Sequence, residues 1–335
     1  MQKELDVLSI CNVLKDIIIK VTDEELVELC IAKGMMHLIS EEEQQKILNK
    51  FENRDKRVEI GGSGTNAMRT MAILGQKVSQ AGMVGDDLYG EICLQRVKEL
   101  GIKSNIKKSP IGNTGTSIIL ITPDGERTMN TCLGMSRCYT VNDIPEDDIA
   151  KSKYLHITGY QWDTDNQIEA INHAIRVAKK NDTKISFDLS DPFCVDRHRE
   201  TFLNIIKDYV DVVFANLKET KMLTGKGLEE SLEMLSELSD LVIIKCGSEG
   251  SWIKSKTETI RIQANKITVV DTTAAGDMYA GGFMFGLTRD LSLAECGKIA
   301  NFCAETVIQQ VGAKIPEDLT QKVEEHLQKK LSYVS

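Results

Sequence analysis

The sequence predicts an α/β protein in which helices cover both faces of a mostly parallel sheet. Strand-like apolar runs alternate with amphipathic helical runs along most of the 335 residues, and this alternation is typical of parallel sheets. Two segments, 16–40 and 115–134, interrupt it with strand-like runs that no helix pattern follows. These interruptions predict a second, smaller sheet, which we interpret as a lid over one edge of the main sheet.

Hydrophobic periodicity and turn residues place the individual elements. The strands are expected at 5–11, 57–60, 77–84, 154–159, 183–188, 211–215, 241–246 and 251–254. The helices are expected at 64–75, 87–100, 165–180, 228–239, 276–288 and 293–311. A further β-branched run, 268–270, is expected to end a strand, and Pro123-Asp124-Gly125 predicts a hairpin turn within 115–134.

Composition and charge limit the classes of function. The chain is 41% hydrophobic and 27% charged, as is ordinary for a globular protein with a core of its own. Its net charge of −9 argues against a nucleic-acid surface. No apolar run is long enough to span a bilayer, and the N-terminus does not resemble a signal peptide. The nine cysteines form no Cys-x-x-Cys pair, so we expect reduced thiols in a cytoplasmic protein.

The segment from Asp271 to Asp277 carries the strongest chemical signal. Its small residues precede a helix pattern, and small residues at a helix N-terminus expose N–H groups to an anion. The predicted anion hole consists of Ala274, Ala275 and Gly276. Asp277 is itself negative, so its presence beside a phosphate is best explained as a base that takes the proton of an attacking hydroxyl.

Two polar segments nearer the N-terminus are candidates for binding the acceptor. Gly62 lets the backbone pass close to a ligand, and Asn66 in the helical turn that follows can donate and accept toward hydroxyls. Asn66 stands where a dinucleotide motif has its third glycine, which disfavours an NAD-dependent oxidoreductase. Asn12 and Asp16 follow the first predicted strand. Asp16 is either a turn acid or a carboxylate that accepts two adjacent hydroxyls.

Two later segments are candidates for binding a nucleotide. Asn216 and Glu219 follow a strand, where α/β folds commonly bind ligands. They could surround Mg²⁺ with oxygen atoms and water, or form an ordinary helix cap, and the segment alone favours neither. Gly247 and Gly250 predict a tight hairpin. Lys245 before them could reach a phosphate, although a solvated lysine at a strand end is the simpler interpretation.

Together and in order, these segments resemble the ribokinase-like (PfkB) family of carbohydrate and purine-nucleoside kinases, over about residues 5–318. The last segment is similar to the family's Asp-Thr-x-Gly-Ala-Gly-Asp motif, with Ala274 at a glycine position. If that position needs a positive φ, the alanine would be strained. The resemblance implies one kinase domain over 1–335, a Rossmann-like three-layer α/β/α sandwich with a small β-sheet lid. The lid would come from about 12–45 and 112–138, and the core from the remainder.

The resemblance also implies roles for the candidate residues. Asp277 would be the general base. The acceptor would be held by Asn12, Asp16, Gly62 and Asn66. ATP and Mg²⁺ would be the cofactors, with potassium left open, and the ATP-binding residues would be Asn216, Glu219, Lys245, Gly247, Gly250 and Asn301. Glu219 would hold Mg²⁺ through water, and the nucleotide base would lie near the loop 262–266. The partners would be small molecules, with no nucleic acid and no membrane, for a monomer or a homodimer.

The acceptor itself stays open at this point. The N-terminal layout resembles the adenosine-kinase-like branch, but Gln161 stands where eukaryotic adenosine kinases place a stacking aromatic residue. A sugar acid would call for an arginine, which Arg127 or Arg137 in the predicted lid could supply. We expect transfer of the γ-phosphate of ATP to a primary hydroxyl of a sugar or ribonucleoside. The alternatives are a sugar-acid kinase of the 2-keto-3-deoxygluconate type and a non-catalytic sugar or nucleotide sensor.

Overall fold

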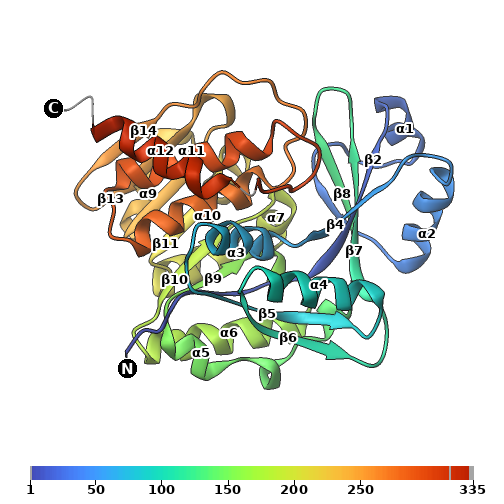
Figure 1. Cartoon of the computed structure of the whole chain (residues 1–335), viewed down its shortest axis with the longest axis horizontal. Coiled ribbons are helices and arrows are strands. Elements are labelled where there is room, and N and C mark those ends of the chain that lie inside the picture. The colour runs from blue at the N-terminus through green and yellow to red at the C-terminus, as the bar shows by residue number, and fades with distance from the viewer. Residues whose placement is uncertain (1, 317, 332–335) are drawn as a thin grey trace.

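Two sheets of different size organise the chain in the computed structural model, which describes residues 2–316 and 318–331 (Figure 1). The larger sheet has the strand order β14-β13-β12-β11-β10-β9-β1-β5-β6, and the smaller has the order β3-β8-β7-β2-β4. The predicted α/β class with a small subsidiary sheet is therefore confirmed.

The main sheet is parallel from β12 to β6, and β13 and β14 add antiparallel strands at one edge. Its strands are β1 (Leu5–Ile10), β5 (Val78–Gly85), β6 (Lys103–Ser109), β9 (Ser152–Thr158), β10 (Lys184–Asp188), β11 (Val212–Asn216), β12 (Leu241–Lys245), β13 (Ser251–Ser255) and β14 (Thr259–Ile262). Central strands such as β12 are aliphatic up to their last residue, here Leu241 to Ile244, because both of their faces are buried under helices.

Helices cover the two faces of this sheet and build a separate core on each. One layer contains α3 (Ser63–Ile73), α4 (Leu88–Glu99), α10 (Ala275–Thr288) and α11 (Leu293–Val307). The other contains α5 (Glu146–Lys151), α6 (Asp165–Lys180), α7 (Pro192–Tyr209), α8 (Leu217–Thr224) and α9 (Leu228–Leu238). The last helix, α12 (Leu319–Leu331), packs Leu319 and Val323 against the α11 side. The three-layer sandwich follows from these two cores.

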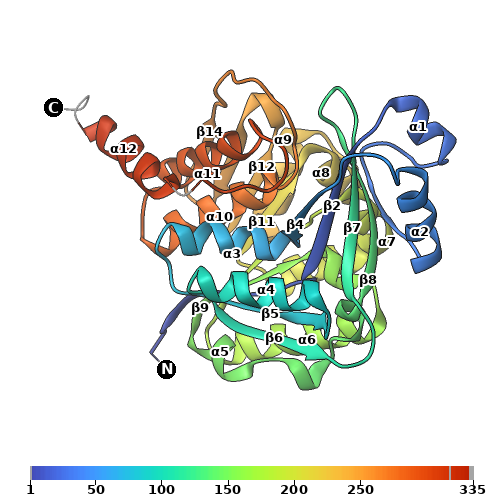
Figure 2. The same ribbon diagram turned by 45° about the vertical axis from the view of Figure 1, so that its right-hand side comes forward.

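The small sheet stands beside the main body, with two helices on its outer side (Figure 2). Its strands are β2 (Leu14–Lys20), β3 (Met36–Leu38), β4 (Arg57–Gly61), β7 (Thr114–Ile121) and β8 (Arg127–Gly134), and its helices are α1 (Asp23–Glu28) and α2 (Glu41–Lys50). β7 and β8 form the predicted hairpin around the Pro-Asp-Gly turn. Ile17, Ile19 and Leu120 pack against α1 and α2, so the opposite face of the sheet is turned toward the main body.

Several expected elements differ in the structure. Residues 57–60, predicted as core, form the edge strand β4 of the small sheet, where they pair with β2. The strand expected at 268–270 is wrong, because these residues form a loop in which Val269 and Val270 remain 47% and 40% exposed. The helix predicted to reach 311 ends at Val307. None of the helices in the described ranges has the length and apolar character that a membrane crossing needs.

Candidate active site

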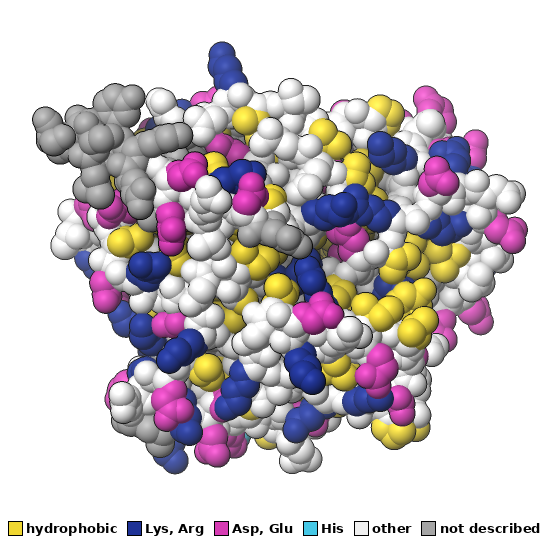
Figure 3. Space-filling view, viewed as in Figure 1, with side chains coloured by type: hydrophobic (Ala, Val, Ile, Leu, Met, Phe, Trp, Pro, Cys, Tyr) yellow, Lys and Arg dark blue, Asp and Glu magenta, His cyan; other side chains and the backbone are white. Residues whose placement is uncertain are grey.

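A cavity of about 990 Å³ lies between the C-terminal ends of the main-sheet strands and the inner face of the small sheet. Figure 3 shows the hollow from outside, with basic and acidic side chains close together at its rim. Every site residue that the sequence predicted lines this cavity, from Asn12 to Asn301. Segments up to 289 positions apart in sequence thus meet at one place.

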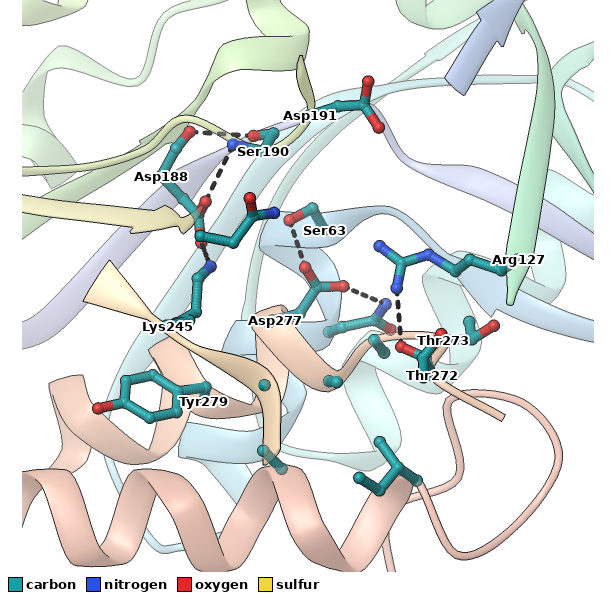
Figure 4. Close-up of a pocket in the computed structure, with 18 of the residues that line it drawn as sticks. Ser63, Arg127, Asp188, Ser190, Asp191, Lys245, Thr272, Thr273, Asp277 and Tyr279 are labelled. Carbon is teal, nitrogen blue, oxygen red and sulfur yellow. Dashed lines mark hydrogen bonds and ion pairs between the residues drawn. The ribbon is translucent and has the colours of Figure 1, made fainter. Parts of the chain in front are cut away.

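Asp277 lies in the first turn of α10 and faces the start of α3 (Figure 4). Its Oδ1 accepts a hydrogen bond from Ser63 Oγ at 2.6 Å, and its Oδ2 accepts one from Asn66 Nδ2 at 3.0 Å. Burial raises the pKa of Asp277, and these two hydrogen bonds limit the rise. The carboxylate is therefore fixed in orientation and more basic than a surface aspartate.

The turn before Asp277 has the geometry of an anion site. Ala274 has φ +61° and ψ 8°, the left-handed conformation that glycine adopts more easily. The Ala275 N–H donates to the Thr272 carbonyl at 3.2 Å and closes the turn. The N–H groups of Gly276 and Asp277 stand in the first helical turn, where geometry provides no intrahelical partner. An anion can accept hydrogen bonds from this end of α10.

Asp16 lies on β2, with its carboxyl group directly over Gly61. A Cβ at Gly61 would stand 2.1 Å from that carboxyl group, so only glycine fits. Gly62 has φ +99°, and a Cβ there would stand 2.2 Å from the Asn12 carbonyl oxygen. Burial, together with the charges of Asp277 and Glu59, raises the pKa of Asp16 to about 8. The glycine pair thus lets a carboxylate approach the start of α3.

Asn12 and its neighbours form the wall of the cavity at the end lined by Asp16. Asn12 Oδ1 accepts from Gln167 Nε2 at 2.7 Å, and Asn12 Nδ2 donates to the Tyr160 carbonyl at 3.2 Å. Its amide is therefore held by the protein itself. Gln161, expected at a stacking position, is 1% exposed and does not line the cavity, whereas Tyr160 does.

Asn216 and Glu219 form a reciprocal capping box at the start of α8. The Asn216 side chain accepts from the Glu219 N–H at 2.9 Å, and Glu219 accepts from the Asn216 N–H at 2.7 Å. The helix-cap interpretation is thus correct in geometry, and both residues also line the cavity. Burial raises the pKa of Glu219 to about 7, and the nearby Lys245 opposes the rise.

Lys245 is not the solvated lysine that the strand end suggested. Its Nζ lies 3.0 Å from Asp188 Oδ2, and the two side chains are only 14% and 4% exposed. Burial opposes its charge, but Asp188 and Glu219 outweigh burial and raise the pKa of Lys245. A Cβ at Gly276 would lie 3.1 Å from this ammonium group. The lysine therefore places a positive charge beside the N-terminus of α10.

The loop after β14 forms the far end of the cavity. Asn301 Nδ2 donates to the Gln263 carbonyl at 3.0 Å, and Glu305 accepts from the Asn265 N–H at 2.7 Å. Both side chains come from α11 and fasten the loop expected to meet the nucleotide base. Gly247 and Gly250 edge this region in a short turn between β12 and β13.

Several side chains of the site escaped the sequence predictions for site residues, among them Ser63, Asp188, Ser190 and Asp191. Asp188 ends β10, the position where α/β sheets commonly bind ligands, so its place at a strand end was an available signal. Of the two lid arginines considered, Arg127 lines the cavity and donates to the Thr272 carbonyl at 2.7 Å, whereas Arg137 is exposed elsewhere. Figure 4 shows Arg127 reaching from β8 to this carbonyl.

Sequence comparison gives the family of this α/β protein. Residues 18–319 match the family model described as pfkB family carbohydrate kinase. The match covers most of the chain, so the chain belongs to the PfkB family and is a carbohydrate or nucleoside kinase. The resemblance inferred from the motifs is thereby confirmed.

The curated relatives are sugar and sugar-acid kinases. The chain is 28% identical over 242 residues to an uncharacterized sugar kinase of Archaeoglobus fulgidus, covering 72% of this chain and 95% of the relative. It is 28% identical over 275 residues to a 5-dehydro-2-deoxygluconokinase of Bacillus subtilis, covering 75% and 81%.

Among solved structures, the adenosine kinase from Sinorhizobium meliloti is 35% identical with a TM-score of 0.93, covering 96% of this chain and 99% of that one. A probable sugar kinase from Rhizobium etli is 33% identical with the same TM-score, covering 97% and 99%. Similarity thus extends to both nucleoside and sugar kinases.

Proposed function

We propose that this kinase transfers the γ-phosphate of ATP to a primary hydroxyl of a ribonucleoside or a neutral sugar, with Asp277 as the general base. One observation carries the proposal. A carboxylate held by Ser63 and Asn66 stands at the open N-terminus of a helix, so the base and the anion site occupy the same turn.

At the acceptor end, Asp16 and Asn66 bind and orient the sugar hydroxyls. The attacking hydroxyl takes the place of Ser63 beside Oδ1 of the carboxylate, while Asn66 keeps Oδ2, and it gives its proton to Asp277. Its oxygen forms the new bond to the γ-phosphorus while the bond to the bridging oxygen breaks, and ADP leaves. The N–H groups at the start of α10 stabilise the charge on the transferring phosphoryl group, a contribution worth about 3–4 kcal/mol per donor in comparable sites.

At the nucleotide end, Lys245 neutralises phosphate charge beside Gly276. Asp188 and Glu219 provide two buried carboxylates suited to Mg²⁺, which prefers oxygen ligands and keeps part of its water shell. Among the described residues, no group of three or more acidic, histidine or cysteine side chains could hold a metal alone. These two carboxylates would hold the ion together with ATP and water, and the ion would supply charge neutralisation. The loop 262–266, which Asn301 and Glu305 hold by hydrogen bonds, contacts the adenine base of ATP in this proposal.

The lining of the acceptor end favours a neutral molecule. Asp16, Asp163 and Asp191 line this end together with Asp277. Arg197 already pairs with Asp163, and Arg127 already donates to a backbone carbonyl. The inner face of the lid adds an apolar wall suited to a nucleoside base, formed by Met36, Ile119, Met129 and Leu133. A carboxylate-bearing acceptor would be repelled by this acidic lining.

A panel of acceptors tests the proposal. The protein is assayed for ADP release with adenosine and other ribonucleosides, ribose and further neutral sugars, and sugar acids including 5-dehydro-2-deoxygluconate. We expect turnover with a nucleoside or neutral sugar. Turnover with sugar acids alone would support the relatives' reaction and overturn our choice of acceptor. Binding of ATP without turnover of any acceptor would favour the sensor. Repeating the productive assay in potassium and in sodium tests the open question of a monovalent ion.

A further inference from the structure

The buried cation Arg69 lies next to the active site and has no role in the proposed phosphoryl transfer. Arg69 follows Asn66 by one turn of α3 and is only 9% exposed, although arginine side chains are usually at the surface. Its side chain lines a second cavity of about 580 Å³, bounded by β4, α3 and α4. It therefore approaches Asn66 from outside the active-site cavity.

Its hydrogen bonds join three segments that meet behind the acceptor site. Nη1 donates to the Ile60 carbonyl and to Asn66 Oδ1, each at 3.2 Å. Nη2 donates to the Ala313 carbonyl at 3.4 Å. The guanidinium thus connects the end of β4, the first turns of α3 and the loop after α11.

The contact with Asn66 decides which way its amide points. An asparagine amide presents one oxygen and one NH₂ group, and arginine has donors only. The guanidinium can therefore donate only to the amide oxygen, which turns the NH₂ group of Asn66 toward Asp277 Oδ2 at 3.0 Å. With the amide rotated by half a turn, an oxygen would face the carboxylate, so the hydrogen bond would be replaced by repulsion.

We propose that Arg69 is a positioning residue for phosphoryl transfer, because it fixes the amide of Asn66 and through it the carboxylate of Asp277. The proposal rests on the function proposed above. Arg69 touches neither substrate nor the reacting atoms, so it acts only through Asn66.

Kinetics of three variants test this role. Arg69→Gln removes the charge and the fork of donors, and Arg69→Lys keeps the charge. Arg96→Gln removes a cation that lines the same second cavity and pairs with Glu99 on the surface. We expect kcat to fall about 10–100-fold in both Arg69 variants, as a misplaced base would cause. The KM for ATP and all parameters of Arg96→Gln should stay close to wild type. Full activity in Arg69→Lys would mean that charge alone matters, and would overturn the proposal.

A second measurement does not depend on finding the acceptor. The Asp277 carboxyl group is titrated by ¹³C NMR in protein labelled at aspartate, with Asp277→Asn assigning the signal. Loss of the Asn66 donor should raise the midpoint by about one pH unit in Arg69→Gln and Arg69→Lys, and leave it unmoved in Arg96→Gln. If the titration midpoint of Asp277 were the same in the Arg69 variants as in wild type, the proposal would be overturned. If wild type phosphorylates no acceptor, the proposed function fails, while this titration still decides the role of Arg69.

Discussion

The buried ion pair between Lys245 and Asp188 allows a prediction about the free energy of unfolding that can be tested without a substrate. Lys245→Met removes the cation and keeps a side chain of similar length. Asp188 and Glu219 are 3% and 1% exposed, so both buried carboxyl groups lose their neutralising neighbour. Removing one member of a buried ion pair typically lowers the free energy of unfolding by about 3–5 kcal/mol. Asp188 retains the Ser190 N–H at 3.0 Å, so we expect the lower end, about 3 kcal/mol.

The loss of unfolding free energy in Lys245→Met should increase as pH rises. The folded-state pKa of Glu219 is already raised to about 7, so the native state binds this proton more tightly than the unfolded state. Such a group contributes less stability as pH rises from its ordinary value of about 4.3 toward its folded value. Without Lys245 the folded pKa rises further. The deficit of Lys245→Met should therefore be larger at pH 8 than at pH 5.5.

Urea unfolding at the two pH values measures the deficit. Lys254→Met is a matched control, because Lys254 makes an ion pair of the same 3.0 Å length with Glu233, whose side chain is 69% exposed. A pair of that kind contributes at most about 1 kcal/mol. An equal loss in the two variants, or a Lys245→Met deficit that is the same at both pH values, would refute the reasoning.

Two further predictions concern acceptor binding and the anion hole. The pKa of Asp16 is raised to about 8. In the proposed function its charged form accepts hydrogen bonds from the acceptor hydroxyls, so the acceptor Kd should fall as pH rises from 7 to 9. Calorimetry measures this, and Asp16→Asn should bind weakly and independently of pH; a flat wild-type profile would contradict the assignment. At Ala274, φ +61° costs alanine about 1–2 kcal/mol, which the greater unfolded-state freedom of glycine partly offsets. Ala274→Gly should keep kcat and change stability by less than about 1 kcal/mol, whereas the β-branched Ala274→Val should lose at least about tenfold in kcat as the N–H groups shift. Wild-type rates in Ala274→Val would exclude this conformation.

Some of the fold could be predicted because its signals are local. The alternation of strands and helices, the Pro-Asp-Gly hairpin and the periodic face of α9 depend on neighbouring residues. Partner choice is not local: residues 57–61 have the pattern of any strand, and only pairing with β2 assigns them to the small sheet. The run 268–270 looked like a strand, yet Val269 and Val270 stay exposed in a loop.

The site residues also divide into those with a local sequence signal and those that depend on distant partners. Small residues before Asp277 and the glycines before Asn66 have few uses other than close backbone approach, so their positions could be found in the sequence. Lys245 was misjudged because its partner Asp188 lies 57 positions away on another strand. Arg69 gave no signal either, since its acceptors include the carbonyls of Ile60 and Ala313, which only the fold brings together.

The central claim is that Asp277 takes the proton of the acceptor hydroxyl, and Asp277→Asn tests it most directly. Asparagine keeps the shape of the side chain but cannot accept that proton. With saturating ATP and the productive acceptor, the single-turnover rate should fall by about 10²–10⁴-fold, while the Kd for ATP stays nearly unchanged. A near-normal rate in this variant would contradict the account.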